Sequence, residues 1–168
     1  MRNWTRKIEV AANVAIIIVA VAISLVLVKI YFANANHSRP ERIAAGSKLV
    51  LEGLNWQKNE RTLLIALKPG CSFCADSAPF YQSLPAKLIP QRKMSVVALV
   101  PDDIPNASSY PKELGINVDE IRQTSLTKAK ILGTPTLVLV NNTGTVEKVW
   151  VGKLSSSQEK DVIDSLSH

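Results

Sequence analysis

The chain has 168 residues, of which 46% are hydrophobic, and a formal net charge of +6 at pH 7. This length accommodates one globular domain and an additional segment. Residues 1–35 and residues 36–168 each contribute a net charge of +3, and the second part contains no dense run of Lys and Arg. A nucleic-acid-binding surface is therefore not predicted.

The N-terminal part of the chain has the pattern of a membrane anchor. Val10 to Val28 are nineteen residues without a charge, close to the roughly 20 that a helix needs to cross a bilayer. The sequence predicts three parts: an N-terminal cytoplasmic flank and transmembrane anchor in residues 1–32, a polar linker in residues 33–47, and a globular domain in residues 48–168.

A cleaved signal peptide is the alternative for this segment. Ala33-Asn34-Ala35 resembles a small-residue cleavage site. However, the uncharged run is longer than the roughly 7–15 apolar residues of a signal peptide, which favours an uncleaved anchor. Lys and Arg are similarly frequent before and after the run, so charge does not orient it. Because a single N-terminal anchor usually serves to export the domain attached to it, we expect a single-pass protein of the inner membrane with a periplasmic domain.

The remaining elements alternate between strands and helices. The expected strands are residues 48–51, 62–67, 94–100, 136–140 and 145–151, with a brief extended piece near 118–121. The expected helices are residues 72–88, 106–114, 124–132 and 155–166, and Pro79 should kink the first of them. This order, ending in a hairpin and a closing helix, predicts an α/β fold with a mixed central sheet flanked by helices.

The two cysteines of the chain, Cys71 and Cys74, stand where the 62–67 strand is followed by a helix. The N-terminus of a helix carries partial positive charge and unpaired N–H groups, and both stabilise a thiolate. We therefore predict that Cys71 is the attacking sulfur and that Cys74, one turn further on, resolves the mixed disulfide. Gly70, Ser72 and Phe73 complete the predicted active-site loop.

Two other interpretations of the cysteine pair remain. A zinc site needs about four ligands, and only His37 and His168 are available as histidines, so no metal is expected. A structural disulfide that closes such a short loop would restrict the unfolded chain little. Redox chemistry is the preferred interpretation, with the Cys71–Cys74 disulfide as the redox group and no separate cofactor.

Three local motifs resemble the thioredoxin superfamily. They are the strand followed by Cys71-Ser72-Phe73-Cys74, Pro79 five residues after the second cysteine, and Gly133-Thr134-Pro135-Thr136 leading into a strand. The resemblance covers about residues 48–166 and is greatest to membrane-anchored thiol–disulfide oxidoreductases of the TlpA/ResA-like kind. It implies a thioredoxin-like fold behind an N-terminal transmembrane helix.

The resemblance also assigns a role to Thr134 and Pro135. On sequence alone this proline would be expected in trans, because only about 5–6% of X–Pro bonds in folded proteins are cis. The family has a cis-proline loop here, beside the two sulfurs. The resemblance therefore implies that the Thr134 backbone pairs with an extended substrate chain, and that Thr134 and Pro135 are substrate-binding residues.

The sequence departs from the family pattern at three positions. Gly70 stands where thioredoxins usually have Trp, Ile65 where they have a buried acid, and Ser77 where many TlpA-like proteins have Glu. Without an acid beside it, Cys74 should be a slow nucleophile near pH 7, because the thiolate fraction controls attack. Lys68 is interpreted as a solvated residue or as a nearby cation, and Asp76 as a solvated residue that complements the helix dipole.

Together these features predict a membrane-tethered thiol–disulfide oxidoreductase that exchanges disulfides with extracytoplasmic proteins. A separate redox partner must recycle it, because the chain has no second cysteine pair. One alternative is a peroxiredoxin-like thiol peroxidase, although Lys68 and Leu64 stand where that family has Thr or Ser and Pro. Another is a non-catalytic thioredoxin-fold domain that binds or chaperones a partner.

Overall fold

The computed structural model describes residues 2–35, 41–87 and 94–167. The chain separates into two compact units, Met1–Arg39 and Pro40–His168. His37 and the rest of residues 36–40, inside the expected linker, lie outside the described residues, as do His168 and Leu88, the expected end of a helix.

The first unit contains one long helix, α1 (Arg2–Ala35). Its stretch Ala12–Phe32 has 21 residues and is long and apolar enough to cross a membrane, a test that an N-terminal signal sequence also passes. The side chains of Ala12–Phe32 are exposed.

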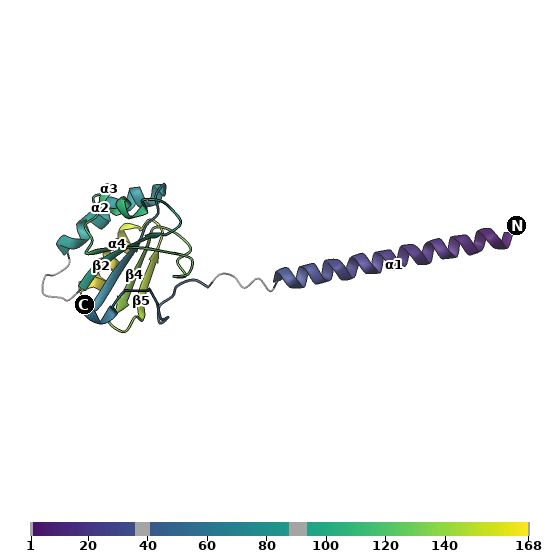
Figure 1. Cartoon of the computed structure of the whole chain (residues 1–168), viewed down its shortest axis with the longest axis horizontal. Helices are drawn as coiled ribbons and strands as arrows, with labels where there is room; N and C mark the ends of the chain where they lie inside the picture. Colours follow the sequence, from purple (N-terminus) through teal and green to yellow (C-terminus); the bar gives the residue numbers. More distant parts are fainter. Residues whose placement is uncertain (1, 36–40, 88–93, 168) are drawn as a thin grey trace. The chain divides into compact units, whose positions relative to one another are not determined.

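The second unit is built on a five-stranded mixed sheet (Figure 1). Its strands are β1 (Arg61–Ala66), β2 (Met94–Pro101), β3 (Glu120–Thr124), β4 (Thr136–Asn141) and β5 (Val146–Val151), in the spatial order β3-β2-β1-β4-β5. The β1–β2 and β2–β3 pairs are parallel, and the β1–β4 and β4–β5 pairs are antiparallel. The predicted mixed sheet is confirmed.

Helices cover one face of this sheet. Successive side chains of a strand point to opposite faces, and Leu63 and Ile65 of β1 point to this one, where they join a core with α2 and α4. The helices here are α2 (Ser72–Lys87), η2 (Ala107–Ser109), α3 (Tyr110–Glu113) and α4 (Ser156–Ser167). Figure 1 shows α2 and α3 on the same side of β2.

The other face of the sheet is covered mainly by irregular segments. Leu64 and Ala66 of β1 point to it and pack in a second core with residues from 43–56 and 126–131. Within the described residues, the short η1 (Trp56–Lys58) is the only helical turn that adds to this core. The sheet is thus flanked by helices on one face and by loops on the other.

Several element predictions need correction. The helix expected at 124–132 is wrong: Thr124 ends β3, and residues 126–130 form turns in which Lys130 adopts a left-handed conformation with φ of 60°. The expected strand at 48–51 is reduced to an isolated bridge between Lys48 and Thr145. The extended piece expected near 118–121 is the edge strand β3, which continues to Thr124.

Candidate functional site

The sheet register brings two separate loops together. Ala66 at the end of β1 pairs with Thr136 at the start of β4, so the loop that leaves β1 and the loop that enters β4 lie at the same end of the sheet. The first loop leads to Cys71, and the second contains the Thr134–Pro135 peptide bond. That bond is cis, which confirms the conformation expected from the family resemblance.

The cysteine loop turns sharply before α2 begins. Gly70 has a φ of 76°, a conformation that favours glycine, and the Cys71 N–H donates to the Lys68 carbonyl at 3.2 Å. Ser72 is the first residue of α2, and both Ser72 and Phe73 are exposed. Cys71 therefore lies immediately before the helix, as predicted, where the first free N–H groups point.

Cys71 is partly exposed and is a free thiol. Its sulfur accepts a hydrogen bond from the Cys74 backbone N–H at 3.2 Å. Burial alone raises the pKa of Cys71, but hydrogen bonds from the Cys74 thiol, the Thr134 side chain and nearby backbone groups outweigh it. The pKa of Cys71 is therefore lower than the ordinary value of 9.0, and the thiolate is favoured.

Cys74 has the opposite character. It is a free thiol and fully buried. Burial, together with the hydrogen bond between the two thiols, raises its pKa to about 12. Of the two, the partly exposed Cys71 thus ionises more readily, while the buried Cys74 keeps its proton near neutral pH.

The proline loop is held firmly against this pair. The Cys71 thiol lies 3.4 Å from the Thr134 carbonyl and donates to it when protonated. The loop itself is fixed by the Gly152 N–H, which donates to the Pro135 carbonyl at 2.7 Å, and by the Thr136 hydroxyl, which donates to the Gly133 carbonyl at 2.7 Å. Thr134 is half-buried and Pro135 is buried. Both predicted substrate-binding residues therefore adjoin the predicted catalytic pair.

Two hollows flank the loop that carries Thr134. One, of about 420 Å³, is lined by Lys68, Pro101, Asp102, Asp103, Ser125, Leu126, Thr127, Ile131, Leu132, Gly133 and Thr134. The other, of about 240 Å³, is lined by Arg42, Ile43, Lys130, Ile131, Leu132, Gly133, Thr136 and Val151. Phe73, Leu132 and Val151 expose large apolar side chains at this end of the unit. An extended polypeptide would find both backbone partners and apolar surface here.

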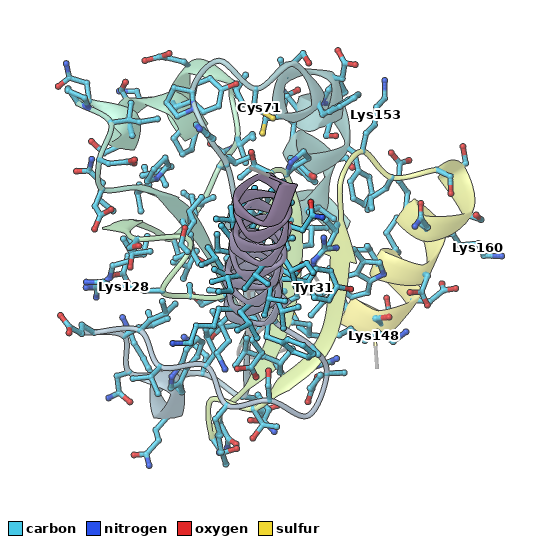
Figure 2. The ribbon with its side chains drawn as sticks, turned by 90° about the vertical axis from the view of Figure 1, so that its right-hand side faces the viewer. Tyr31, Cys71, Lys128, Lys148, Lys153 and Lys160 are labelled. Atoms are coloured by element: carbon cyan, nitrogen blue, oxygen red, sulfur yellow. The ribbon has the colours of Figure 1, made fainter. Side chains whose placement is uncertain are left out.

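The charged residues near the site, Lys68, Asp76 and Lys153, lie at the surface. Asp76, on the first turns of α2, forms an ion pair with Lys153 at 3.0 Å, and both side chains are about half exposed. Figure 2 places Cys71 and Lys153 at the same end of the unit, away from Lys148. Lys68 is exposed and lines the larger hollow. In the described part of the chain, no three His, Cys, Asp or Glu side chains gather so that they could hold a metal ion.

Sequence reasoning missed one residue beneath the dithiol. Tyr81 is buried on α2, two turns after Cys74, and belongs to the same core. Its spacing of seven residues from Cys74 would have placed it on the same helix face. Ile65 and Ser77, at the positions where the family has acids, are both buried as well.

Comparisons with known proteins bear on the fold. No protein-family model matches the sequence, and no curated protein sequence matches it. Several solved structures do match. StoA from Bacillus subtilis has a TM-score of 0.52 and 18% identity over 66% of this chain and 84% of its own. A DsbF homologue from Corynebacterium diphtheriae has a TM-score of 0.51 and 20% identity over 65% of this chain and 73% of its own.

A third match comes from a domain of the expected size. The thioredoxin domain of a thiol-disulfide oxidoreductase from Bacteroides vulgatus has a TM-score of 0.51 and 17% identity, over 75% of this chain and 99% of its own. Matches at this level of identity bear on the fold and not on the substrate. The part of the chain that follows α1 has a thioredoxin-like fold, of the kind found in thiol-disulfide oxidoreductases.

Proposed function

We propose that the chain is a membrane-tethered thiol–disulfide oxidoreductase that exchanges disulfides with extracytoplasmic proteins through Cys71 and Cys74. The observation that carries the proposal is the contrast between the two sulfurs. Cys71 is accessible and has a lowered pKa, whereas Cys74 is fully buried and has a pKa of about 12. Exchange through a mixed disulfide needs one sulfur that attacks first and a second that waits behind it.

The contrast sets the order of the chemical steps. The Cys71 thiolate attacks a substrate disulfide, a Cys71–substrate disulfide forms, and the first substrate sulfur leaves as a thiolate that takes up a proton. Cys74 then loses its proton and attacks the Cys71 sulfur, and the second substrate sulfur leaves with the electron pair of the broken bond. Two electrons pass from the dithiol to the substrate, and the reverse sequence oxidises a substrate dithiol.

The loop at Thr134 and Pro135 is the proposed substrate-binding element. An extended segment of the substrate would pair with the Thr134 backbone, as in strand addition to a sheet edge. The exposed apolar side chains of Phe73, Leu132 and Val151 would pack against residues on either side of the substrate cysteine. This surface suits a polypeptide better than a small disulfide, and supports protein substrates.

The N-terminal helix supports the remaining parts of the proposal. Ala12–Phe32 has the length and composition of a membrane-spanning helix. We propose that it anchors the protein in the inner membrane by a single span, with the dithiol on the periplasmic side. A separate redox partner would restore the dithiol after each turnover, because the chain has only two cysteines.

The proposal is tested by insulin reduction with the full chain in detergent micelles and dithiothreitol as the electron source. We expect the wild-type protein to accelerate precipitation of the insulin B chain and Cys71→Ser to abolish the acceleration. Cys74→Ser should instead accumulate a Cys71–substrate adduct that intact-protein mass spectrometry detects. Lys160→Gln, an exposed position on α4, is the matched control and should remain active.

The outcomes separate the alternatives. Activity that survives Cys71→Ser would remove Cys71 from the mechanism and overturn the proposal. Hydrogen peroxide consumption without any reaction toward a substrate disulfide would indicate a peroxidase. A wild-type protein whose dithiol reacts with neither hydrogen peroxide nor a substrate disulfide would indicate a non-catalytic binding domain.

A further inference from the structure

The core beneath the dithiol contains two hydroxyl groups, those of Ser77 and Tyr81, that make no ordinary hydrogen bond while both cysteines are free thiols. On α2, the buried face is formed by Cys74, Ser77, Ala78, Tyr81 and Leu84, three or four residues apart. Ser77 is 6% exposed and Tyr81 is 1% exposed. In the part of the chain that the structure describes, neither hydroxyl makes a hydrogen bond of ordinary geometry, although Ser77 lies near enough to Tyr81 to lower its pKa through a side-chain contact. Buried hydroxyls usually make such a bond, so two together require an explanation.

Ser77 and Tyr81 stand on the same buried face of α2 as Cys74, about one and two turns further along the helix. Long side chains of a helix lean toward its N-terminus, so the Tyr81 hydroxyl reaches back along α2 toward the turns that hold Ser77 and Cys74. Burial raises the pKa of Tyr81 most, Ser77 lowers it in part, and negative charge on Cys74 raises it further. Tyr81 therefore stays protonated throughout the pH range of thiol exchange, and its hydroxyl is available as a donor.

Cys74 is the group that needs further donors when it reacts. Hydrogen bonds from the Lys68 backbone and the Thr134 side chain lower its pKa, but burial outweighs them. To attack the mixed disulfide Cys74 must become a thiolate, and a buried thiolate needs hydrogen bonds in place of water. The acid that could assist it in related folds is replaced by Ile65, which is buried and apolar. Once Cys71 is bonded to a substrate, the hydrogen bond between the two thiols is also lost.

The other ionisable groups that face this region do not supply a positive charge. They are Cys71 at the start of α2, Tyr110 and Glu113 from α3, and Glu159 from α4. Each of these groups can only be neutral or negatively charged, so none of them supplies the positive charge that would favour a thiolate on Cys74. Neutral donors can favour it, and the Ser77 and Tyr81 hydroxyls are the candidates on α2 beside the Lys68 backbone and Thr134.

We propose that Ser77 and Tyr81 are positioning residues that donate hydrogen bonds to the Cys74 thiolate as it forms in the mixed disulfide. This rests on the proposed function. In the step itself, Cys74 gives up its proton, a bond forms between the Cys74 and Cys71 sulfurs, and the bond from Cys71 to the substrate breaks. The substrate sulfur leaves with the electron pair and takes up a proton, while both hydroxyls keep theirs.

Substitution gives a clean test, because the dithiol state loses no hydrogen bond of ordinary geometry. Tyr81→Phe and Ser77→Ala remove hydroxyls that, within the described residues, make no ordinary hydrogen bond and interact only weakly with each other. A purely structural role therefore predicts an unchanged or higher melting temperature and unchanged kinetics. A role in the resolving step predicts a change in that step alone.

The experiment uses the full reduced chain in detergent micelles and methyl methanethiosulfonate, a small uncharged reagent. The reagent forms a methyl disulfide on Cys71, and the resolving step releases methanethiol when Cys74 attacks. Rapid quenching and intact-protein mass spectrometry give both rates between pH 6 and 10. We expect Tyr81→Phe with Ser77→Ala to slow release about tenfold at pH 7, equivalent to about one unit in the pKa of Cys74. The defect should shrink as the pH rises, and formation of the methyl disulfide should stay unchanged.

Tyr110→Phe is the matched control, because Tyr110 also faces the dithiol but is only half-buried. Its release profile should follow that of the wild type. Release profiles that superimpose for the wild type and the double variant would overturn the inference and leave the proposed function intact. A wild-type protein that never releases methanethiol would overturn both.

Discussion

The backbone N–H of Cys74 donates a hydrogen bond to the Cys71 sulfur at 3.2 Å. The Cys74 thiol donates to the same sulfur. Cys74 therefore supports the Cys71 thiolate twice, once through a backbone group that any residue except proline would keep, and once through its own side chain. The two contributions can be separated by substitution.

Cys74→Ala should raise the pKa of Cys71, because it removes the side-chain donor and keeps the backbone N–H. Cys74→Ser should raise it less, because the hydroxyl can still donate. The thiolate fraction at pH 7 falls as the pKa rises, by up to about tenfold for each unit. The pH dependence of Cys71 alkylation by iodoacetamide measures the effect, and equal rates for the alanine variant and the wild type would contradict it.

Gly70→Ala should destabilise the protein by about 1 kcal/mol, because a left-handed conformation costs a residue with a Cβ atom roughly that amount. Gly70 has a φ of 76°, and nothing lies within 4 Å of an added Cβ, so the cost is conformational and not steric. Gly133→Ala is the matched control, since its Cβ would meet Val151 Cγ1 at 3.8 Å, an ordinary contact. Denaturant unfolding of both variants checks the difference, and equal midpoints would argue against strain at residue 70.

Asp161→Asn should lower the melting temperature at pH 7. The Asp161 carboxylate accepts hydrogen bonds from Lys148 Nζ at 2.9 Å and from Trp150 Nε1 at 2.8 Å, and these bonds lower its pKa. A lowered pKa in the folded state contributes stability above the unfolded pKa, which is lost as the pH falls through the folded value. The difference between wild type and variant should therefore be present at pH 7 and shrink below about pH 4.

A pH series of melting temperatures measures this difference. Asp164→Asn, at an exposed position on the same helix, serves as the control and should show little effect at any pH. The difference in melting temperature between the wild type and Asp161→Asn could instead stay constant down to pH 2. That result would show that the negative charge of the carboxylate does not stabilise the contact.

The full chain should stay in the membrane fraction after extraction with alkaline carbonate. Ala12–Phe32 is a largely apolar stretch of 21 residues, which is enough for a spanning helix, and spanning helices resist such extraction. A chain that lacks residues 2–35 should be extracted. The intact mass of the membrane-bound protein tests cleavage at the same time, because loss of the first 35 residues would identify the helix as a signal peptide.

The central part of the fold could be predicted from the sequence. The 62–67 run is apolar without alternation, as expected of a strand covered on both faces, and the structure has it as β1. The proline loop was predicted only through the family resemblance, because nothing local to Thr134 and Pro135 distinguishes a cis bond from a trans one. The contact between that loop and Cys71 depends on the register of β1 with β4, which is set by tertiary pairing.

The helix expected at 124–132 failed for a local reason. The Ser125 side chain and carbonyl accept the N–H groups of Lys128 and Ala129 and close a single turn. Lys130 then adopts a positive φ, which ends the turn, and Ala129 and Ile131 are buried against the second face of the sheet. The burial of these two side chains outweighed the helical propensity of residues 124–132.

The loop-covered face of the sheet has a consequence for how the chain tolerates proteolysis. Ile43 is buried there, its N–H donates to the Lys130 carbonyl, and Gly46 and Leu49 are hydrogen-bonded to the β4–β5 hairpin. A protease cut between Ser47 and Lys48 would separate residues 1–47 from the domain, and with them Ile43, which shares this core with Val138 and Val140. The trimmed domain would keep both sulfurs but expose part of this apolar core to water, and should self-associate.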